Sequence, residues 1–151
     1  MMRWRNARDI YRVGVLRRTY VDSGVLIWAA QGDCGNAALA LPFITDCGRE
    51  YVTSDYVRLE LIPKATFHRN RSELEFYETF LRANTRCVPT SDSLTAQAME
   101  HGCATGISGI DALHIARAVF AGAEEFITTE KPTKPIHRTK LIKVISIRPP
   151  E

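Results

Sequence analysis

Four acidic side chains follow, open or lie within predicted secondary-structure elements at points that would bring them together. They are Asp22, Glu60, Asp111 and Glu130. Asp22 and Glu130 come just after two predicted strands, and Asp111 opens a predicted helix after a glycine-containing turn. The carboxyl ends of parallel strands share one edge of an open α/β sheet, and ligands bind at that edge. We therefore expect the four carboxylates to meet in one crevice.

A cluster of this kind favours the chemistry of a divalent cation. Carboxylates held close together repel one another and raise each other's pKa values unless a positive charge neutralises them. Mg²⁺ and Mn²⁺ prefer oxygen ligands, and Mg²⁺ takes further coordination from water and substrate phosphate. One or two such ions can activate a water for in-line attack on phosphorus. The four acids thus predict metal-dependent hydrolysis of phosphodiester bonds.

Each acid taken alone also has a simpler explanation. Asp111 could be a helix N-cap, and Asp22 could be a turn former before Ser23-Gly24. Glu60 lies in the run Leu59 to Ile62 and could still project into water. The joint placement of the acids, more than any one of them, carries the metal-site hypothesis.

Alternating strand and helix signals must position these acids. Predicted strands cover 19–21, 50–53, 86–88, 125–128 and 141–147. Predicted helices cover 25–30, 35–45, 54–63, 73–83, 94–103 and 111–121. The third begins at an N-cap, Ser54, and ends at Pro63, and the fourth follows a capping box at 72–75. Strands separated by helices of this length indicate an α/β fold with a mainly parallel sheet covered on both faces.

Length and charge limit the class of protein. With 151 residues, 45% of them hydrophobic and 25% charged, the chain suits one soluble domain. No apolar run approaches the roughly 18 residues that span a bilayer. Residues 1–18 hold six Arg and one Asp, and residues 131–151 hold six basic residues and one Glu, whereas the middle is net acidic. Basic margins around an acidic body favour an anionic polymer as partner, although basic tails on a solvated surface would give the same pattern.

The four cysteines argue against a zinc site. Cys34, Cys47, Cys87 and Cys103 are widely spaced and form no C-x-x-C pair. The arginine-rich start lacks the apolar core of a secretory signal, and an organelle-targeting peptide is a weaker alternative. We expect free, mostly buried thiols in a reducing cytoplasm and no membrane association.

Several segments resemble one known family. The segments TYVDS at 19–23, DALHIA at 111–116 and GAEEFITTE at 122–130, together with Glu60, resemble the PIN-domain nucleases and in particular the VapC-type toxins. The resemblance spans about residues 19–147. It implies a three-layer α/β/α sandwich around a parallel sheet of about five strands. It also implies a Mg²⁺ or Mn²⁺ site that cuts single-stranded RNA.

The resemblance assigns roles to the acids. Asp22, Glu60 and Asp111 match the three metal-binding acids of the family. The family usually has Asp in a T-x-D pattern at the fourth position, where this chain has Glu130 after Thr129. Glu130 could bind the metal directly or through water, with help from the Thr129 hydroxyl. Alternatively, the second metal site is poorly formed and the protein is weakly active or retains only binding.

Other residues near the acids are candidates for supporting roles. Ser23 and Ser108 could hydrogen-bond the carboxylates or a metal-bound water, or could simply cap helices. His114 lies three positions after Asp111, and a packed structural histidine is favoured over a proton donor. Basic residues that could contact RNA phosphates are Arg69, Arg71, Lys131, Lys134, His137 and Arg138. Aromatic residues expected in the core or an oligomer face are Trp28, Phe43, Phe76, Tyr77 and Phe80.

The resulting domain assignment is a basic extension over 1–18 and a PIN-like domain over 19–151. The extension is either an RNA-binding arm or an unstructured tail. The expected partners are an RNA substrate, a cognate antitoxin that covers the crevice, and a second copy of the chain. A PIN-like RNA- or protein-binding module is the alternative function. A phosphatase is disfavoured because Gly24 occupies the position two residues after Asp22, where a second Asp would be needed.

Overall fold

Five parallel strands form the centre of the protein. The structure is a computed structural model that describes residues 16–32, 34–83 and 85–151. The strands are β1 (Arg17–Val21), β2 (Arg49–Ser54), β3 (Thr85–Val88), β4 (Glu125–Thr128) and β5 (Lys143–Ser146). They pair in the order β3-β2-β1-β4-β5, and every neighbouring pair is parallel. The predicted parallel sheet is confirmed, as are the approximate positions of its strands.

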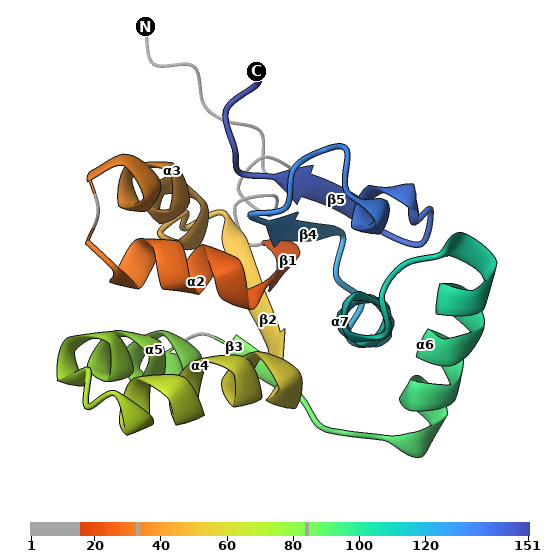
Figure 1. Cartoon of the computed structure of the whole chain (residues 1–151), viewed down its shortest axis with the longest axis horizontal. Helices are drawn as coiled ribbons and strands as arrows, with labels where there is room; N and C mark the ends of the chain where they lie inside the picture. Colours follow the sequence, from red (N-terminus) through yellow and green to blue (C-terminus); the bar gives the residue numbers. More distant parts are fainter. Residues whose placement is uncertain (1–15, 33, 84) are drawn as a thin grey trace, which may run out of the picture.

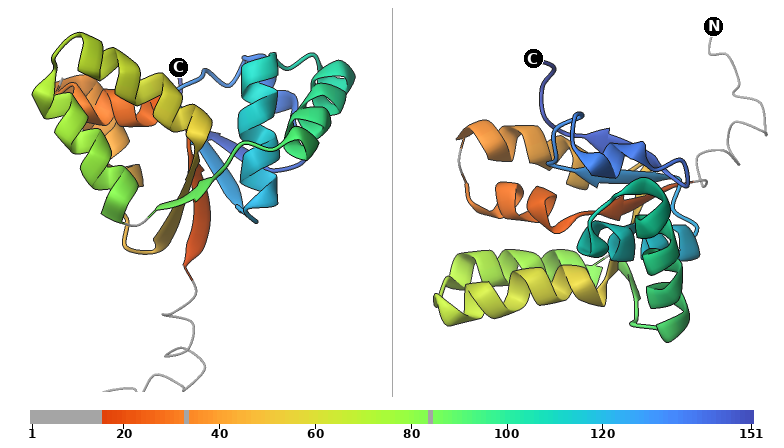
Figure 2. Two further views of the ribbon diagram at one scale, coloured as in Figure 1. Left: turned by 90° about the horizontal axis from the view of Figure 1, so that it is seen from below. Right: turned by 45° about the vertical axis from the view of Figure 1, so that its right-hand side comes forward.

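Helices cover both faces of this sheet (Figure 1). Figure 2 shows α2 to α5 on one face and α6 with α7 on the other, which gives the predicted three-layer sandwich. Their bounds are α2 (Ser23–Ala30), α3 (Cys34–Ile44), α4 (Asp55–Phe67), α5 (Arg71–Ala83), α6 (Asp92–Thr105) and α7 (Gly109–Phe120). A short 3₁₀ helix, η1 (Pro135–Arg138), lies between β4 and β5.

The two central strands are buried because helices pack on both of their faces. All four residues of β4 are buried, as are Thr19, Tyr20 and Val21 in β1. The Tyr20 ring stacks on that of Phe126 in the neighbouring strand, with centroids 5.0 Å apart. Near-continuous burial is typical of central parallel strands. These strands therefore form a rigid base for the residues that follow them.

The chain reverses its direction of travel across the sheet at β1. It proceeds from β1 to β2 and β3 on one side, and returns to β4 and β5 on the other. The Asp22 backbone N–H donates to the Ile127 carbonyl at 3.1 Å, so the ends of β1 and β4 lie side by side. A crevice at such a switch point is where open α/β sheets bind ligands.

Three predicted helix boundaries are wrong. Helix α4 continues through Pro63 to Phe67, because Pro63 is exposed while Leu61 and Ala65 bury the other face of the helix. Helix α5 has no capping box at Ser72; the Asn70 side chain instead accepts the Glu73 N–H at 3.2 Å. Helix α7 begins at Gly109, two residues before Asp111.

The cysteine expectation also needs correction. Cys47, Cys87 and Cys103 are free thiols, and all three are exposed, not buried. Each lies near the end of an element or in a loop, where the core does not cover it. The five aromatic residues named above do contribute to the core, with Tyr77 buried and the others packed against it. Within the described ranges, no helix has both the length and the apolar character needed to span a membrane.

The domain boundary at residue 19 falls within β1. Arg17 and Arg18 belong to this strand, and the Arg18 guanidinium donates to Glu50 and to the Ala121 carbonyl. Residues 1–15 of the expected basic extension lie outside the described residues.

Candidate metal centre

Asp22 is held at the end of β1 by three neighbouring groups. It is the N-cap of α2, and its Oδ1 accepts the Ser23 backbone N–H at 2.9 Å. Its Oδ2 accepts the Thr128 hydroxyl at 2.8 Å, which links the ends of β1 and β4. The next residue but one is Gly24, where any side chain would clash because a Cβ would lie 2.4 Å from Thr129 Oγ1. The tight contact between α2 and β4 thus fixes the direction of the Asp22 carboxylate.

Glu60 reaches the same point from α4. Its Oε2 accepts the Ser23 hydroxyl at 3.1 Å, and its Oε1 accepts from His114 Nε2 at 2.6 Å. One ligand atom from each of Asp22, Glu60 and His114 lies within 4.8 Å of the other two. Three elements distant in sequence therefore bring two carboxylates and an imidazole to one place.

His114 forms part of a buried hydrogen-bonded chain. Its Nδ1 lies 2.7 Å from the Tyr20 hydroxyl, which is itself 2.7 Å from Ser54 Oγ. Because Nε2 donates to a carboxylate, a neutral ring accepts the Tyr20 proton at Nδ1, and Tyr20 accepts from Ser54. Both ring nitrogens of His114 are thus occupied by protein. This arrangement suits a residue that orients Glu60 better than one that binds a metal itself.

Asp111 lies in the first turn of α7, and its carboxylate forms no ion pair with the described residues. Ser108 is the N-cap, and its Oγ accepts the Asp111 backbone N–H at 3.3 Å. Ser108 therefore caps the helix, which leaves the Asp111 carboxylate without a capping role. The negative charge of Asp111 is close enough to contribute to the raised pKa of Asp22.

Glu130 is not part of the compact cluster. Its backbone N–H donates to the Thr128 hydroxyl at 3.2 Å, and its carbonyl accepts from His137. Among the described residues, its carboxylate makes no ion pair, and it does not belong to the group formed by Asp22, Glu60 and His114. Thr129 packs beneath Gly24 at the rim of the site. Glu130 therefore lies at the expected strand end but, like Asp111, outside the group that holds Asp22 and Glu60.

The two clustered carboxylates differ in their electrostatics. Burial raises the pKa of Asp22, and the charges of Glu60 and Asp111 raise it further against the opposing effects of His114 and Thr128. Burial also acts to raise the pKa of Glu60, but the hydrogen bonds from His114 and Ser23 outweigh it and lower the pKa below its ordinary value. Asp22 is thus the carboxylate that would gain most from a nearby cation.

The donor set fits a hard divalent cation. Asp22, Glu60 and Asp111 offer carboxylate oxygens, which are the ligands that Mg²⁺ and Mn²⁺ prefer. Burial raises the pKa of Asp22, and the charges of Glu60 and Asp111 act in the same direction, so its ionised form would be stabilised by a cation. In the described part of the chain, neither Lys nor Arg forms an ion pair with any of these three residues. A bound divalent ion would supply the missing positive charge.

The predicted RNA-contacting residues fall into two groups. Arg69 and Arg71 are exposed at the turn between α4 and α5. The others lie after β4, where Lys134 is exposed, Lys131 pairs with Glu151 at 3.2 Å, and Arg138 donates to the Thr105 carbonyl. Contact with RNA stays a prediction for both groups.

Tyr20, Ser54 and Thr128 were not anticipated as site residues. Tyr20 is one position before Val21 in an ordinary strand pattern, and nothing in its neighbours marks its hydroxyl as functional. Thr129 is the supporting threonine predicted from the sequence, whereas in the structure the Thr128 hydroxyl donates to Asp22. Successive strand residues point to opposite faces, so the exact end of β4 decides which threonine reaches the site.

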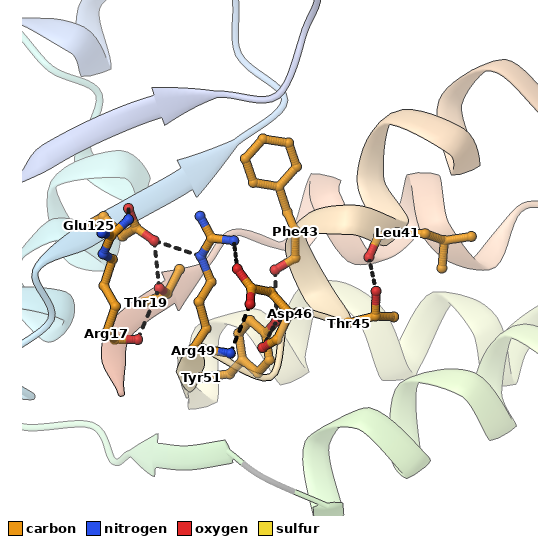
Figure 3. Close-up of polar contacts among 10 residues, drawn as sticks. Arg17, Thr19, Leu41, Phe43, Thr45, Asp46, Arg49, Tyr51 and Glu125 are labelled. Carbon is orange, nitrogen blue, oxygen red and sulfur yellow. Dashed lines mark hydrogen bonds and ion pairs between the residues drawn. The ribbon is translucent and has the colours of Figure 1, made fainter. Parts of the chain in front are cut away.

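Glu125, an acidic residue at the opposite edge of the sheet, has a very different environment (Figure 3). Glu125 begins β4 and is 2% exposed. Its Oε1 accepts from Arg49 Nε at 2.7 Å and from the Thr19 hydroxyl at 2.8 Å, and Arg17 lies 3.7 Å from Oε2. Arg49 also pairs with Asp46 at 2.7 Å. This carboxylate is neutralised by the protein itself.

The arrangement of strands and acids is shared with one domain family. A parallel sheet in the order 3-2-1-4-5, with acids after β1, in α4 and at the start of α7, agrees with the resemblance found in the sequence. The family model of the PIN domain matches residues 19–131. The chain therefore belongs to the PIN domain family.

Solved structures with the same fold come from toxin–antitoxin systems. A toxin–antitoxin complex from Klebsiella pneumoniae superposes with a TM-score of 0.64 at 16% identity, covering 86% of this chain and 98% of that one. VapBC2 from Rickettsia felis, bound to a DNA fragment from its promoter, superposes with a TM-score of 0.63 at 14% identity, and the match covers 85% of this chain and 98% of that one. The sarcin-ricin loop cleaving toxin VapC20 from Mycobacterium tuberculosis gives 0.59 at 18% identity, with 72% and 86% coverage. No curated protein matches the sequence.

Proposed function

We propose that this PIN domain is a Mg²⁺- or Mn²⁺-dependent endoribonuclease that hydrolyses phosphodiester bonds of single-stranded RNA. The observation that carries the proposal is that ligand atoms of Asp22, Glu60 and His114 lie within 4.8 Å of one another, while no Lys or Arg of the described residues forms an ion pair with either carboxylate. The nearby charge of Asp111 adds to the same unbalanced site. Membership of the PIN family supports the reaction class.

The residues divide the work between binding and orientation. Asp22, Glu60 and Asp111 would hold the ion, which when bound supplies positive charge for the phosphate and a more acidic water. Thr128 orients Asp22, while Ser23 and His114 orient Glu60. The free side of the crevice, beyond the buried chain of His114, Tyr20 and Ser54, is left for the scissile phosphate.

We further propose that the protein is the toxin of a type II toxin–antitoxin pair. The solved structures of the same fold include toxin–antitoxin complexes, which supports this assignment. An antitoxin would then cover the acidic crevice, and its own positive charge could balance the carboxylates. Assembly as a homodimer and residence in the cytoplasm belong to the same proposal.

The position of Glu130 favours one alternative function. Because its carboxylate does not join the cluster, a second metal site would lack a protein ligand. The domain would then bind RNA or a protein partner with little or no cleavage. Under this alternative, the affinity for Mn²⁺ would be weak.

Cleavage of a mixed-sequence single-stranded RNA with Mn²⁺, Mg²⁺ or EDTA tests the leading proposal. We expect metal-dependent cleavage by the wild-type protein and none by Asp22→Asn or Asp111→Asn. Asp92→Asn is a matched control because Asp92 lies in the first turn of α6, as Asp111 does in α7, but away from the cluster. Absence of cleavage with any metal by folded wild-type protein would favour the binding module.

A further inference from the structure

A separate cavity opens beside Glu60, between α2, α4 and α5. It has a volume of about 190 Å³. Ile27, Leu61, Ala65 and the ring of Tyr77 give it apolar walls. Its polar lining consists of Gln31, Glu60, Lys64, His68, Asn70 and Glu73. Apolar walls combined with a few polar groups are typical of a small-molecule subsite.

Tyr77 presents a hydroxyl to this cavity that is not bonded to another described residue. The residue is 2% exposed and lines the cavity, yet its hydroxyl makes no hydrogen bond to any residue in the described ranges. The other two buried tyrosines, Tyr20 and Tyr51, both have partners. In the described residues the fully buried side-chain polar atoms without a partner belong to Thr53 and Arg117, so the Tyr77 hydroxyl is reached by solvent through the cavity. Tyr77 is therefore positioned to bond a ligand.

The cavity offers a mixed set of hydrogen-bonding groups. The Asn70 carbonyl oxygen is used by Ser72 and by the Glu73 N–H, so the Asn70 amide nitrogen is the end still able to donate. Glu73 is half-buried and makes no ion pair with the described basic residues, so its carboxylate can accept. Burial and the charge of Glu73 raise the pKa of Tyr77 to about 12, which keeps its hydroxyl a donor at neutral pH. Donors and an acceptor close together match the edge of a nucleobase.

Helix α4 connects the cavity to the acidic cluster. Glu60, Lys64 and His68 are spaced four residues apart, so they lie along one side of the helix. Eight residues at 1.5 Å each span about 12 Å. His68, which lines the cavity, contacts the 82% exposed ring of Phe67, with ring centroids 5.2 Å apart. A strand of RNA whose phosphate lies at Glu60 would pass directly over this cavity.

We propose that the cavity binds one unpaired nucleobase of the RNA, next to the nucleotide that is cut, and so sets the base preference of cleavage. The inference rests on the proposed nuclease function but concerns a separate group of residues. Tyr77, Asn70 and Glu73 read the base edge, and Lys64 binds the backbone between the two sites. A base with hydrogen-bond donors on its edge suits Glu73, and guanine presents two adjacent ones.

Nucleotide binding without divalent metal tests the cavity independently of catalysis. The probes are the four nucleoside 5′-monophosphates in EDTA, with ribose 5-phosphate as the control that lacks only the base. We expect the amide resonances of α4 and α5 to shift with at least one nucleotide and not with ribose 5-phosphate. Equal shifts with ribose 5-phosphate would mean that only the phosphate binds, and shifts with no nucleotide would assign the cavity to a protein side chain. Either result overturns the proposal.

Two variants identify the residues that read the base. Tyr77→Phe removes only the unpaired hydroxyl, so the melting temperature should not fall, while nucleotide affinity should drop about three- to tenfold, the effect of one hydrogen bond. Glu73→Gln should change which nucleotide binds best, whereas Glu75→Gln, on the same helix outside the cavity, should not. Unchanged affinity in Tyr77→Phe would overturn the assignment of Tyr77.

Sequencing the ends produced from a randomised single-stranded RNA tests the same cavity during cleavage. We expect a base preference at one position beside the cut in the wild-type protein and its weakening in Tyr77→Phe, with metal affinity unchanged. If the protein does not cleave RNA at all, the nuclease proposal fails. The nucleotide titration then still tests whether the cavity binds a nucleobase. If cleavage occurs with the same preference in both proteins, the cavity has no role in specificity.

Discussion

The two edges of the sheet treat buried carboxylates in opposite ways. At the amino edge, Glu125 is paired with Arg49 and bonded by Thr19. Burial alone would raise the pKa of Glu125, but these partners and the charge of Arg17 lower it below its ordinary value. At the carboxyl edge, Asp22 has acids for neighbours and its pKa is raised. The same strands, β1 and β4, therefore have an acid paired with arginine at one end and, at the other, Asp22 without a Lys or Arg partner among the described residues.

This contrast separates an acid paired within the protein from the acid that we propose binds a metal ion. An acid surrounded by arginines contributes to folding and has no charge left for a ligand. An acid surrounded by other acids lowers the stability of the protein unless a cation binds beside it. The pairing pattern, more than burial or residue type, distinguishes Glu125 from Asp22. The following predictions use the difference between the two edges, from the largest expected effect to the smallest.

Asp22→Asn should abolish function without lowering stability. Mutations of residues that only orient metal ligands cost about 10–100-fold in metal affinity or activity, so loss of a ligand should reduce RNA cleavage by at least about 100-fold. Because Asn removes a destabilising charge, the metal-free free energy of unfolding should stay equal or rise. Cleavage assays and urea unfolding in EDTA measure the two effects. A large loss of metal-free stability would show that Asp22 is a structural acid like Glu125.

Glu125→Gln should have the reverse effect. It leaves Arg49 without its buried carboxylate partner, so the free energy of unfolding should fall by about 2–3 kcal/mol. Metal affinity should not change, because Glu125 lies at the opposite edge of the sheet. Urea unfolding and Mn²⁺ calorimetry check the two parts. A change in Mn²⁺ affinity without a loss of stability would remove the distinction between the edges.

His114→Gln and Tyr20→Phe should weaken the metal site through Glu60. Each interrupts the chain that fixes the Glu60 carboxylate, and we expect about a tenfold loss of Mn²⁺ affinity in calorimetry. If His114 were itself a metal ligand, His114→Gln would lose far more than Tyr20→Phe. If the chain were only structural, both variants would lose stability while keeping their affinity for Mn²⁺.

Acid should remove the stability that comes from Glu125. Its folded pKa lies below the ordinary value of 4.5, so its contribution is present at higher pH and is lost as the pH falls through the folded pKa. The stability difference between wild type and Glu125→Gln should therefore be largest near neutral pH and shrink below about pH 4. Urea unfolding at a series of pH values measures this difference. A difference that does not change with pH would show that Glu125 acts by packing alone.

Most of the fold follows from the sequence, because its signals are local and repeated. The buried segments before Asp22 and Thr129 read as strands, and the helical segments between them required a parallel sheet. The boundaries that failed depended on tertiary context. Burial of Leu61 and Ala65 carried α4 through Pro63, and Asn70 replaced the expected capping box.

The acids of the site were predictable, but their connections were not. Asp22 after a strand, Asp111 at a helix start and Glu60 inside an apolar helix are candidates that the sequence itself indicates. The chain through Tyr20 and Ser54 joins residues 34 to 94 positions apart, for which neither spacing nor composition gives a signal. Glu130 follows β4 as expected, yet the direction of its side chain depends on the turn after the strand. Which side chains form hydrogen bonds across such a separation in sequence is determined by the packing of the folded protein.

Thermal unfolding with and without Mn²⁺ tests the central claim most directly, that the acids at the carboxyl edge are left for a cation. A ligand that binds only the folded state raises its stability. We predict that Mn²⁺ raises the melting temperature of the wild type and of Glu125→Gln by similar amounts, and leaves that of Asp22→Asn unchanged. An equal shift in Asp22→Asn, or no shift in the wild type, would contradict the assignment of this edge as a metal centre.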